Sequence, residues 1–277
     1  SNSSPHVILQ PENKIMDKNL KTNIIRALLS SGVVTMGGWM LIPSPEIAEI
    51  FGNSNFDWVV LDLEHGSIDI SDLPNLFRAL ELNDTLPLVR ISENNTSQAV
   101  RAVEAGAGGV IIPKLEHAGQ AEEMYQCINY PPRGKRGVGY NRGNCYGVNF
   151  NSELVDEPLI VGIIETKAGV EHLDMTLKGY LLEDNRIDAI LIGPYDLSAD
   201  MGMTGDFDNP EFKEAINHIR KTCKERNMAV GYHIVQPHSH ELAKRIDEGY
   251  KFIPFAGDVT MLSHCINVGE VTANHKP

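Results

Sequence analysis

An apolar run breaks off sharply in the stretch Ile190-Leu191-Ile192-Gly193-Pro194-Tyr195-Asp196-Leu197-Ser198. Branched apolar residues that stop at Gly-Pro and give way to an acid are typical of a buried strand that ends in a functional loop. The stretch Leu159-Ile160-Val161-Gly162-Ile163-Ile164-Glu165 has the same form and also ends in a carboxylate. The interval between the two acids leaves room for one helix, so we expect neighbouring parallel strands with both carboxylates at one edge.

The same alternation of apolar run and helical segment extends over the whole chain. A helix is expected over residues 19–30, and helix starts are marked by Ser44-Pro45, Asp72, Thr96 and Asn209-Pro210, where a capping side chain or a proline meets the first turn. Eight strand-like runs follow the first helix, at residues 33–40, 58–63, 86–91, 109–113, 159–165, 187–192, 228–232 and 251–255.

These strands are apolar on both faces, which is typical of a parallel sheet covered by helices. Eight βα units in about 250 residues predict an α/β fold, a single closed (β/α)₈ TIM barrel with an N-terminal helix. A doubly wound open sheet is the structural alternative. We assign residues 19–277 to the barrel domain and residues 1–18 to a flexible N-terminus, in which Ser1-Asn2-Ser3 resembles a cloning remnant.

Composition excludes several classes of protein. The net charge of −13 and the pI near 5.2 argue against a nucleic-acid partner, which needs clustered cations. The four cysteines show neither Cys-x-x-Cys nor Cys/His spacing, so reduced thiols in a cytoplasmic protein are expected. No apolar run approaches the roughly 18 residues of a membrane span, and no membrane partner is expected.

In a (β/α)₈ barrel the active site lies where the strands end. The polar or aromatic residues at the ends of the predicted strands are Trp39, Asp62, Glu64, His65, Arg90, Lys114, Glu165, Asp196 and His233. Two carboxylates without a nearby thiol favour a hard divalent ion, Mg²⁺ or Mn²⁺, with Co²⁺ as a further candidate. The strand ends therefore predict a metal site with a neighbouring cation and histidine.

Several of these residues stand in motifs that follow one another in a familiar order. They include Gly38-Trp39, Asp62-Leu63-Glu64-His65-Gly66, Val89-Arg90, Tyr130-Pro131-Pro132-Arg133-Gly134, Ile164-Glu165-Thr166 and the stretch from Ile192 to Ser198. In these motifs, and over nearly its whole length, the chain resembles the HpcH/HpaI aldolases, which cleave or form 2-keto-3-deoxy acids with pyruvate as the donor. The resemblance implies a carbon-carbon lyase that interconverts a 4-hydroxy-2-oxo acid with pyruvate and an aldehyde through a metal-stabilised enolate.

Residue roles are carried over from this resemblance. It implies that Glu165 and Asp196 ligate the metal, that His65 is the acid/base, and that Arg90 holds oxygen atoms of the keto acid. It also implies supporting roles for Trp39, which would contact substrate, and for Asp62 and Glu104. The backbone around Gly193, Pro194, Tyr195 and Asp196 would receive the pyruvate carboxylate, because oriented N–H groups suit an anion.

The chain departs from the family at position 163, where isoleucine stands and glutamine is expected. That departure affects how a metal-bound water or the keto oxygen would be held. The stretch between Glu165 and Asp196 also looks longer than usual, in a helix that contains residues 178–185. The resemblance further implies a homo-oligomer, commonly a hexamer, in which the last helix (259–268) packs on a neighbour.

Each assignment has a simpler structural alternative. The two acids would then be surface groups at strand ends, His65 a helix cap, Arg90 an ion-pair partner, and Trp39 a packing wall. Glu104 lies on a predicted helix, where a solvated position competes with a role in orienting His65, also from another subunit. His238 and His240 are interpreted as exposed side chains without a matching acid.

Alternative activities also remain open. Lys114 at a strand end could form a Schiff base with a carbonyl, but this would leave the Glu165 and Asp196 pair unexplained. A CoA-ester lyase or an oxaloacetate decarboxylase would use the same enolate chemistry. A sugar-acid sensor that kept the barrel and lost turnover is the non-enzymatic alternative.

Overall fold

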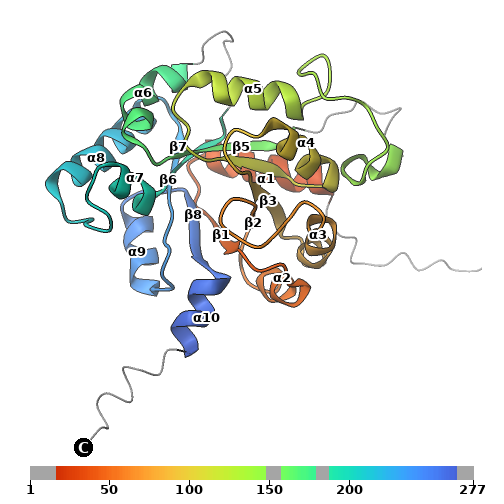
Figure 1. Ribbon diagram of the computed structural model, residues 1–277, viewed down its shortest axis with the longest axis horizontal. Helices are drawn as coiled ribbons and strands as arrows, with labels where there is room; N and C mark the ends of the chain where they lie inside the picture. The colour runs from red at the N-terminus through yellow and green to blue at the C-terminus, as the bar shows by residue number, and fades with distance from the viewer. Residues whose placement is uncertain (1–16, 148–156, 179–186, 267–277) are drawn as a thin grey trace, which may run out of the picture.

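The strands of the computed structural model, which describes residues 17–147, 157–178 and 187–266, form one closed parallel barrel in chain order (Figure 1). They are β1 (Thr35–Met40), β2 (Trp58–Asp62), β3 (Leu86–Arg90), β4 (Gly109–Ile112), β5 (Leu159–Ile164), β6 (Ala189–Ile192), β7 (Ala229–Tyr232) and β8 (Phe252–Gly257). The (β/α)₈ prediction is therefore confirmed and the open sheet is excluded, because β1 pairs with β8 as well as with β2.

Helices surround the barrel. They are α1 (Lys18–Ser30), α2 (Pro45–Gly52), α3 (Leu73–Glu81), α4 (Thr96–Ala105), α5 (Ala118–Ile128), α6 (Lys167–Lys178), α7 (Pro194–Asp200), α8 (Pro210–Glu225), α9 (Ser239–Asp247) and α10 (Asp258–Ile266), with a 3₁₀ helix η1 (Arg142–Gly147). Ser44 caps α2 by accepting the N–H of Ile47 at 3.2 Å, and Asn209 caps α8 by accepting the N–H of Glu211 at 3.0 Å. The cap of α4 is Asn95, one residue before the predicted start.

The inside of the barrel is filled by apolar side chains from the strands and from α1. Ile25 and Leu29 of α1 belong to the same buried cluster as Trp58 and Phe252, whose rings stack at 4.0 Å between centroids. Space for Trp58 comes from Gly37, where a Cβ would lie 2.0 Å from the indole ring. The predicted N-terminal helix therefore completes the core of the barrel.

Inward-facing positions alternate along each strand, as the two-residue period of a strand requires. The buried interior cluster contains Trp58 and Val60 of β2, and Leu86 and Leu88 of β3. It also contains Leu159, Val161 and Ile163 of β5. The next inward positions are Asp62, Arg90 and Glu165, so the alternation that fills the core carries polar side chains into the barrel mouth.

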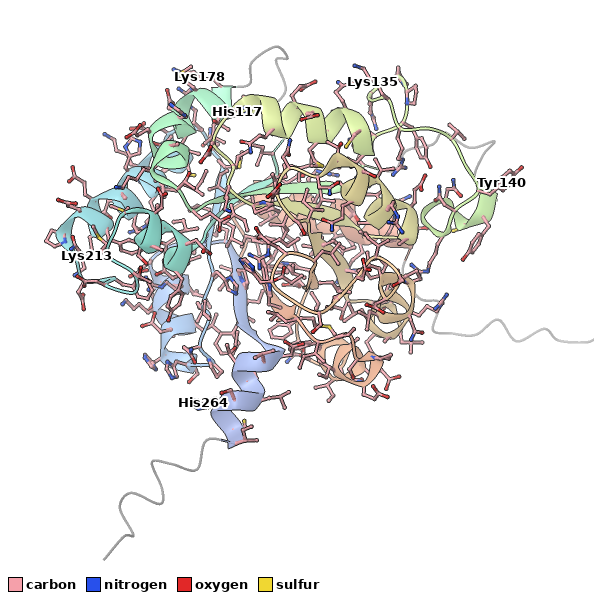
Figure 2. The ribbon with its side chains drawn as sticks, in the orientation of Figure 1. His117, Lys135, Tyr140, Lys178, Lys213 and His264 are labelled. Atoms are coloured by element: carbon pink, nitrogen blue, oxygen red, sulfur yellow. The ribbon has the colours of Figure 1, made fainter. Side chains whose placement is uncertain are left out.

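The last described helix, α10, projects away from the barrel (Figure 1), and Figure 2 shows its His264 at the outer edge of the molecule. Val259, Leu262 and Ile266 on this helix are 45%, 50% and 73% exposed. Residues 1–16 of the predicted N-terminus lie outside the described residues, as do most of the predicted helix at 178–185 and the end of the predicted helix at 259–268. No helix in the described ranges is long and apolar enough to cross a membrane.

Candidate active site

The ends of β3, β5, β6 and β7 surround a small cavity at the carboxyl mouth of the barrel. Its lining includes Arg90, Glu165, Asp196, Tyr195 and His233. A much larger cavity of about 1120 Å³ lies against α5 and contains none of these side chains. The larger cavity lacks these polar groups, so cavity size alone would select the wrong place. We place the candidate active site at the barrel mouth, where the strand-end polar side chains converge.

Asp62 and Arg90 form the buried polar centre of this mouth. They are paired residues at the ends of β2 and β3, and the Nε of Arg90 donates to Asp62 at 2.9 Å while Nη2 donates to its other oxygen. The indole N–H of Trp39 also donates to Asp62, at 2.9 Å. Both partners are at least nine-tenths buried, so this is a fixed arrangement rather than a surface ion pair.

Electrostatics keep both members of the pair charged. Burial would raise the pKa of Asp62, but the hydrogen bonds and charge of Arg90, with donors from Trp39 and the Glu64 backbone, hold that pKa below its usual value. Burial would lower the pKa of Arg90. The hydrogen bonds and negative charge of Asp62 outweigh this effect, so the guanidinium pKa is raised. Arg90 thus carries a permanent positive charge at the cavity wall.

Glu165 follows β5 directly and is 4% exposed. Its Oε1 accepts the backbone N–H of Lys114 at 2.7 Å. Burial raises the pKa of Glu165 to about 7; the Lys114 N–H opposes this shift and the negative charge of Asp196 adds to it. The Lys114 side chain itself is exposed, so its amine lacks the desolvation that a Schiff-base lysine needs.

Asp196 lies in the first turn of α7, which begins at Pro194 after Gly193. The N–H groups of Tyr195 and Asp196 are in this first turn, where a helix has no internal acceptors for them. Gly193 lies against Glu165: a Cβ at this position would stand 2.8 Å from its Oε2. The Gly-Pro break therefore brings the two predicted metal ligands together.

Glu64 and His65 lie on the loop after β2. Glu64 Oε2 lies 3.3 Å from Nη1 of Arg90 and 3.9 Å from Nε2 of His65. The His65 side chain is 58% exposed, and its backbone N–H, rather than its ring, donates to Asp62 at 3.2 Å. His65 is therefore close to the charged network but does not line the small cavity.

Glu104 is separated from this group. It lies in the last turn of α4, which leads through Gly106 into the start of β4, at the opposite end of the barrel from the mouth. The expected role of Glu104 in orienting His65 therefore has no geometric support within one chain. The reason is that a helix after a strand runs back towards the amino ends of the strands.

Two cavity residues were named from the sequence without a catalytic or binding role: His233 as a strand-end residue, and Ile163 as a departure from the family. His233 stacks on Trp39 with 4.5 Å between ring centroids, and Ile163 presents its side chain where the family is expected to have an amide. Both lie at inward positions in the two-residue alternation along β5 and β7. As predicted, His238 and His240 are exposed, and the four cysteines are free.

The donor set fits a hard divalent cation. Glu165 is buried beside a second carboxylate, and a cation would relieve the repulsion that helps to raise its pKa. Within the ranges that the structure describes, no group of three or more His, Cys, Asp or Glu side chains could hold a metal ion. Two protein carboxylates would leave most coordination positions to substrate and water, as in an open catalytic site.

Comparison with known proteins agrees with the motifs. The model of the HpcH/HpaI aldolase/citrate lyase family matches residues 35–265. A hydroxypyruvate/pyruvate aldolase of Roseobacter denitrificans is 31% identical over 255 residues, which cover 91% of this chain and 96% of that protein. A 4-hydroxy-2-oxo-heptane-1,7-dioate aldolase of Escherichia coli is 30% identical over 246 residues, which cover 87% of this chain and 91% of that protein.

A solved structure has the same fold. The HpcH/HpaI aldolase from Desulfitobacterium hafniense superposes with a TM-score of 0.79 at 25% identity, covering 91% of this chain and 97% of the other. The sequence match and the barrel, with the motif residues at its carboxyl mouth, lead to one conclusion. The chain belongs to the HpcH/HpaI aldolase/citrate lyase family.

Proposed function

We propose that this chain is a divalent-metal-dependent aldolase that interconverts a 4-hydroxy-2-oxo acid with an aldehyde and pyruvate or a substituted pyruvate. The observation that carries the proposal is the convergence of Arg90, Glu165 and Asp196 on one cavity at the barrel mouth. The names of the relatives, which are keto-acid aldolases, support the same class of reaction.

Glu165 and Asp196 would hold the metal, Mg²⁺ or Mn²⁺, with Co²⁺ as a further candidate. When bound, the ion supplies a Lewis acid that stabilises negative charge on the keto oxygen. The neighbouring groups support this assignment. The Lys114 N–H orients one oxygen of Glu165, and Gly193 leaves room for the other.

Arg90 would hold the keto acid by donating to its oxygen atoms. As the C3–C4 bond of the substrate breaks, its electron pair is delocalised onto the keto oxygen, where negative charge grows. Asp62 occupies two guanidinium nitrogens, and this fixes the orientation of the third towards Glu64 and the mouth. A donor that is oriented beforehand needs no reorganisation during the reaction, and such donors are among the largest contributions to catalysis.

The substrate carboxylate would be received by the N–H groups of Tyr195 and Asp196, at the break formed by Gly193 and Pro194. His65 would take the proton of the C4 hydroxyl during cleavage and return it during condensation. Its exposure suits proton exchange with water, and histidine is the side chain that most often acts as a general base and acid in enzymes. Trp39 would form a wall of the site, held by its bond to Asp62.

The homo-oligomer that the resemblance implies also belongs to this proposal. Its support is the exposed apolar surface of Val259, Leu262 and Ile266 on α10, which a neighbouring copy would cover. A hexamer is the expected assembly. Sedimentation equilibrium tests it directly, because a monomer in solution would contradict it.

The test follows exchange of the pyruvate methyl protons with D₂O by NMR, alongside condensation of pyruvate with a panel of aldehydes. Both should require Mg²⁺, Mn²⁺ or Co²⁺ and should stop with EDTA. Exchange without metal would contradict the proposed chemistry. Oxaloacetate decarboxylation without activity on any aldehyde would favour the decarboxylase, and binding without exchange would favour a sensor.

A further inference from the structure

His233 lies inside the proposed site but takes no part in the chemistry described above. Its backbone N–H donates to the carbonyl of Ile192 at 3.2 Å, so it extends β7 alongside β6. Two residues after Gly231, it is the next inward position, and its side chain lines the cavity that also contains Arg90 and Glu165. The ring is fixed by its stack on Trp39, at 30° between planes.

His233 is half-buried, and its ring nitrogens make no hydrogen bond to the described residues. Burial lowers the pKa of this imidazole to about 3, and the positive charge of Arg90 contributes, whereas Asp62 opposes the shift. The ring is therefore neutral at ordinary pH and offers one N–H donor and one nitrogen acceptor. A hydroxyl group matches this pair, because it also both donates and accepts.

A second cavity begins at this residue. It has a volume of about 560 Å³ and extends between α8 and α9. Pro194, Tyr195, His233 and Val235 line both cavities, so they form the junction between them. The keto-acid half of the substrate is assigned to Arg90, Glu165 and the backbone N–H groups of Tyr195 and Asp196, which leaves the side chains at the junction, His233 among them, to the aldehyde half.

We propose that His233 is a specificity-determining residue that hydrogen-bonds a hydroxyl group of the acceptor aldehyde. The enzyme would therefore prefer hydroxylated aldehydes, and the groove between α8 and α9 would receive the chain beyond that hydroxyl. This inference rests on the proposed aldolase function. It adds the chemical class of the acceptor and a residue that selects it.

The experiment compares aldehydes that differ by one hydroxyl: glycolaldehyde with acetaldehyde, and lactaldehyde with propanal. His233→Phe keeps an aromatic ring on Trp39 and removes both nitrogens. The ratio of kcat/KM for the hydroxylated aldehyde over its partner should fall at least about 10-fold. His233→Gln keeps a donor and an acceptor and should retain most of the preference. His240→Phe, the same change at an exposed site, should leave the ratio unaltered.

Folding of each variant is checked by circular dichroism, and His233→Met replaces the phenylalanine variant if that variant is unfolded. An unchanged ratio, or an equal loss for both aldehydes, would overturn the role of His233. Wild-type enzyme that exchanges pyruvate protons but prefers neither member of a pair would also overturn it. Absence of exchange in wild-type enzyme would instead contradict the proposed function itself.

Discussion

Among single residues, the proposed chemistry depends on how the guanidinium of Arg90 is held. Arg90 contacts Asp62 through two nitrogens and Glu64 through the third, and it lies 5.1 Å from the centre of the Trp39 ring. Sequence reasoning left two interpretations of Arg90, a substrate contact or an ion-pair partner. The geometry makes these compatible, because the ion pair with Asp62 is what would orient the substrate contact.

Arg90→Lys should retain the charge and lose its placement, since an ammonium cannot reproduce the planar fork of donors. We expect a fall of roughly 10²-fold or more in both retro-aldol turnover and pyruvate methyl-proton exchange, as for loss of an oriented oxyanion donor. Both rates are measured for Arg90→Lys and for the wild-type enzyme under the same conditions. If exchange stays at the wild-type level while cleavage falls, Arg90 serves the aldehyde half instead.

His65→Ala should slow aldol cleavage by roughly 10²–10⁴-fold, the usual contribution of a general base. Pyruvate binding and metal binding should be largely retained, because His65 lies outside the cavity that holds Glu165 and Asp196. Steady-state rates and calorimetric titration with Mn²⁺ separate these effects. A cleavage rate equal to wild type would restrict His65 to a structural role on the β2–α3 loop.

Gly193→Ala tests whether Glu165 must keep its position. The new Cβ would stand 2.8 Å from Oε2 and 3.1 Å from Cβ of Glu165, so the carboxylate has to move. We expect the Mn²⁺ concentration for half-maximal activity to rise roughly 10-fold or more, the effect of disturbing a ligand's support. Gly137→Ala is the control, because no atom lies within 4 Å of its added Cβ. Equal metal activation in the two variants would argue against Glu165 as a ligand.

At the scale of elements, α1 is attached to the barrel by a polar contact as well as by its apolar face. The Nε of Arg26 donates to Asp188 at 2.7 Å, and its Nη2 donates to the carbonyl of Glu157 at 2.9 Å. The second oxygen of Asp188 accepts the N–H of Ile160 at 2.8 Å. One arginine of the N-terminal helix therefore contacts the segments just before β5 and β6.

Arg26→Ala should lower the free energy of unfolding by about 2 kcal/mol, because it leaves the Asp188 carboxylate without its charged partner. Urea denaturation measures the change. Arg78→Ala is the matched control, since that side chain is exposed on α3 and contacts only Asn75, at 3.5 Å, among the described residues. Similar losses in the two variants would show that the contact between α1 and the barrel contributes little.

At the scale of the whole molecule, the proposed metal would join two separate βα units. Glu165 follows β5 and Asp196 lies after β6, so an ion held by both should bind the folded barrel and not the unfolded chain. The repulsion between the buried Glu165 and the exposed Asp196 is part of the fold without metal. Metal binding should therefore also act as a stabilising ligand.

Mg²⁺ or Mn²⁺ at about 100 times its dissociation constant should stabilise the protein by about 2.7 kcal/mol, which raises Tm by roughly 5 °C or more. Differential scanning calorimetry with and without EDTA measures this. Glu165→Gln should abolish the increase, whereas Glu116→Gln, a nearby acid outside the cavity, should keep it. A Tm that responds to metal equally in both variants would place the ion elsewhere.

The barrel and most positions of the candidate site could be predicted from the sequence. Eight apolar runs, each followed by a helical segment, are typical of a parallel sheet covered by helices, and their number in about 250 residues favours a closed barrel over an open sheet. Because side chains alternate inward and outward along a strand, Asp62, Arg90 and Glu165 had to follow core residues into one mouth. The placement of these three side chains at the barrel mouth therefore follows from the local strand pattern.

Which side chains meet across the mouth could be learned from the folded barrel alone. Barrel closure brings Trp39 of the first unit against His233 of the seventh, although the two are far apart in the sequence. Strand register pairs Asp62 with Arg90, and the direction of α4 carries Glu104 to the opposite end. These contacts depend on the tilt, register and closure of all eight strands together, which no local stretch of sequence specifies.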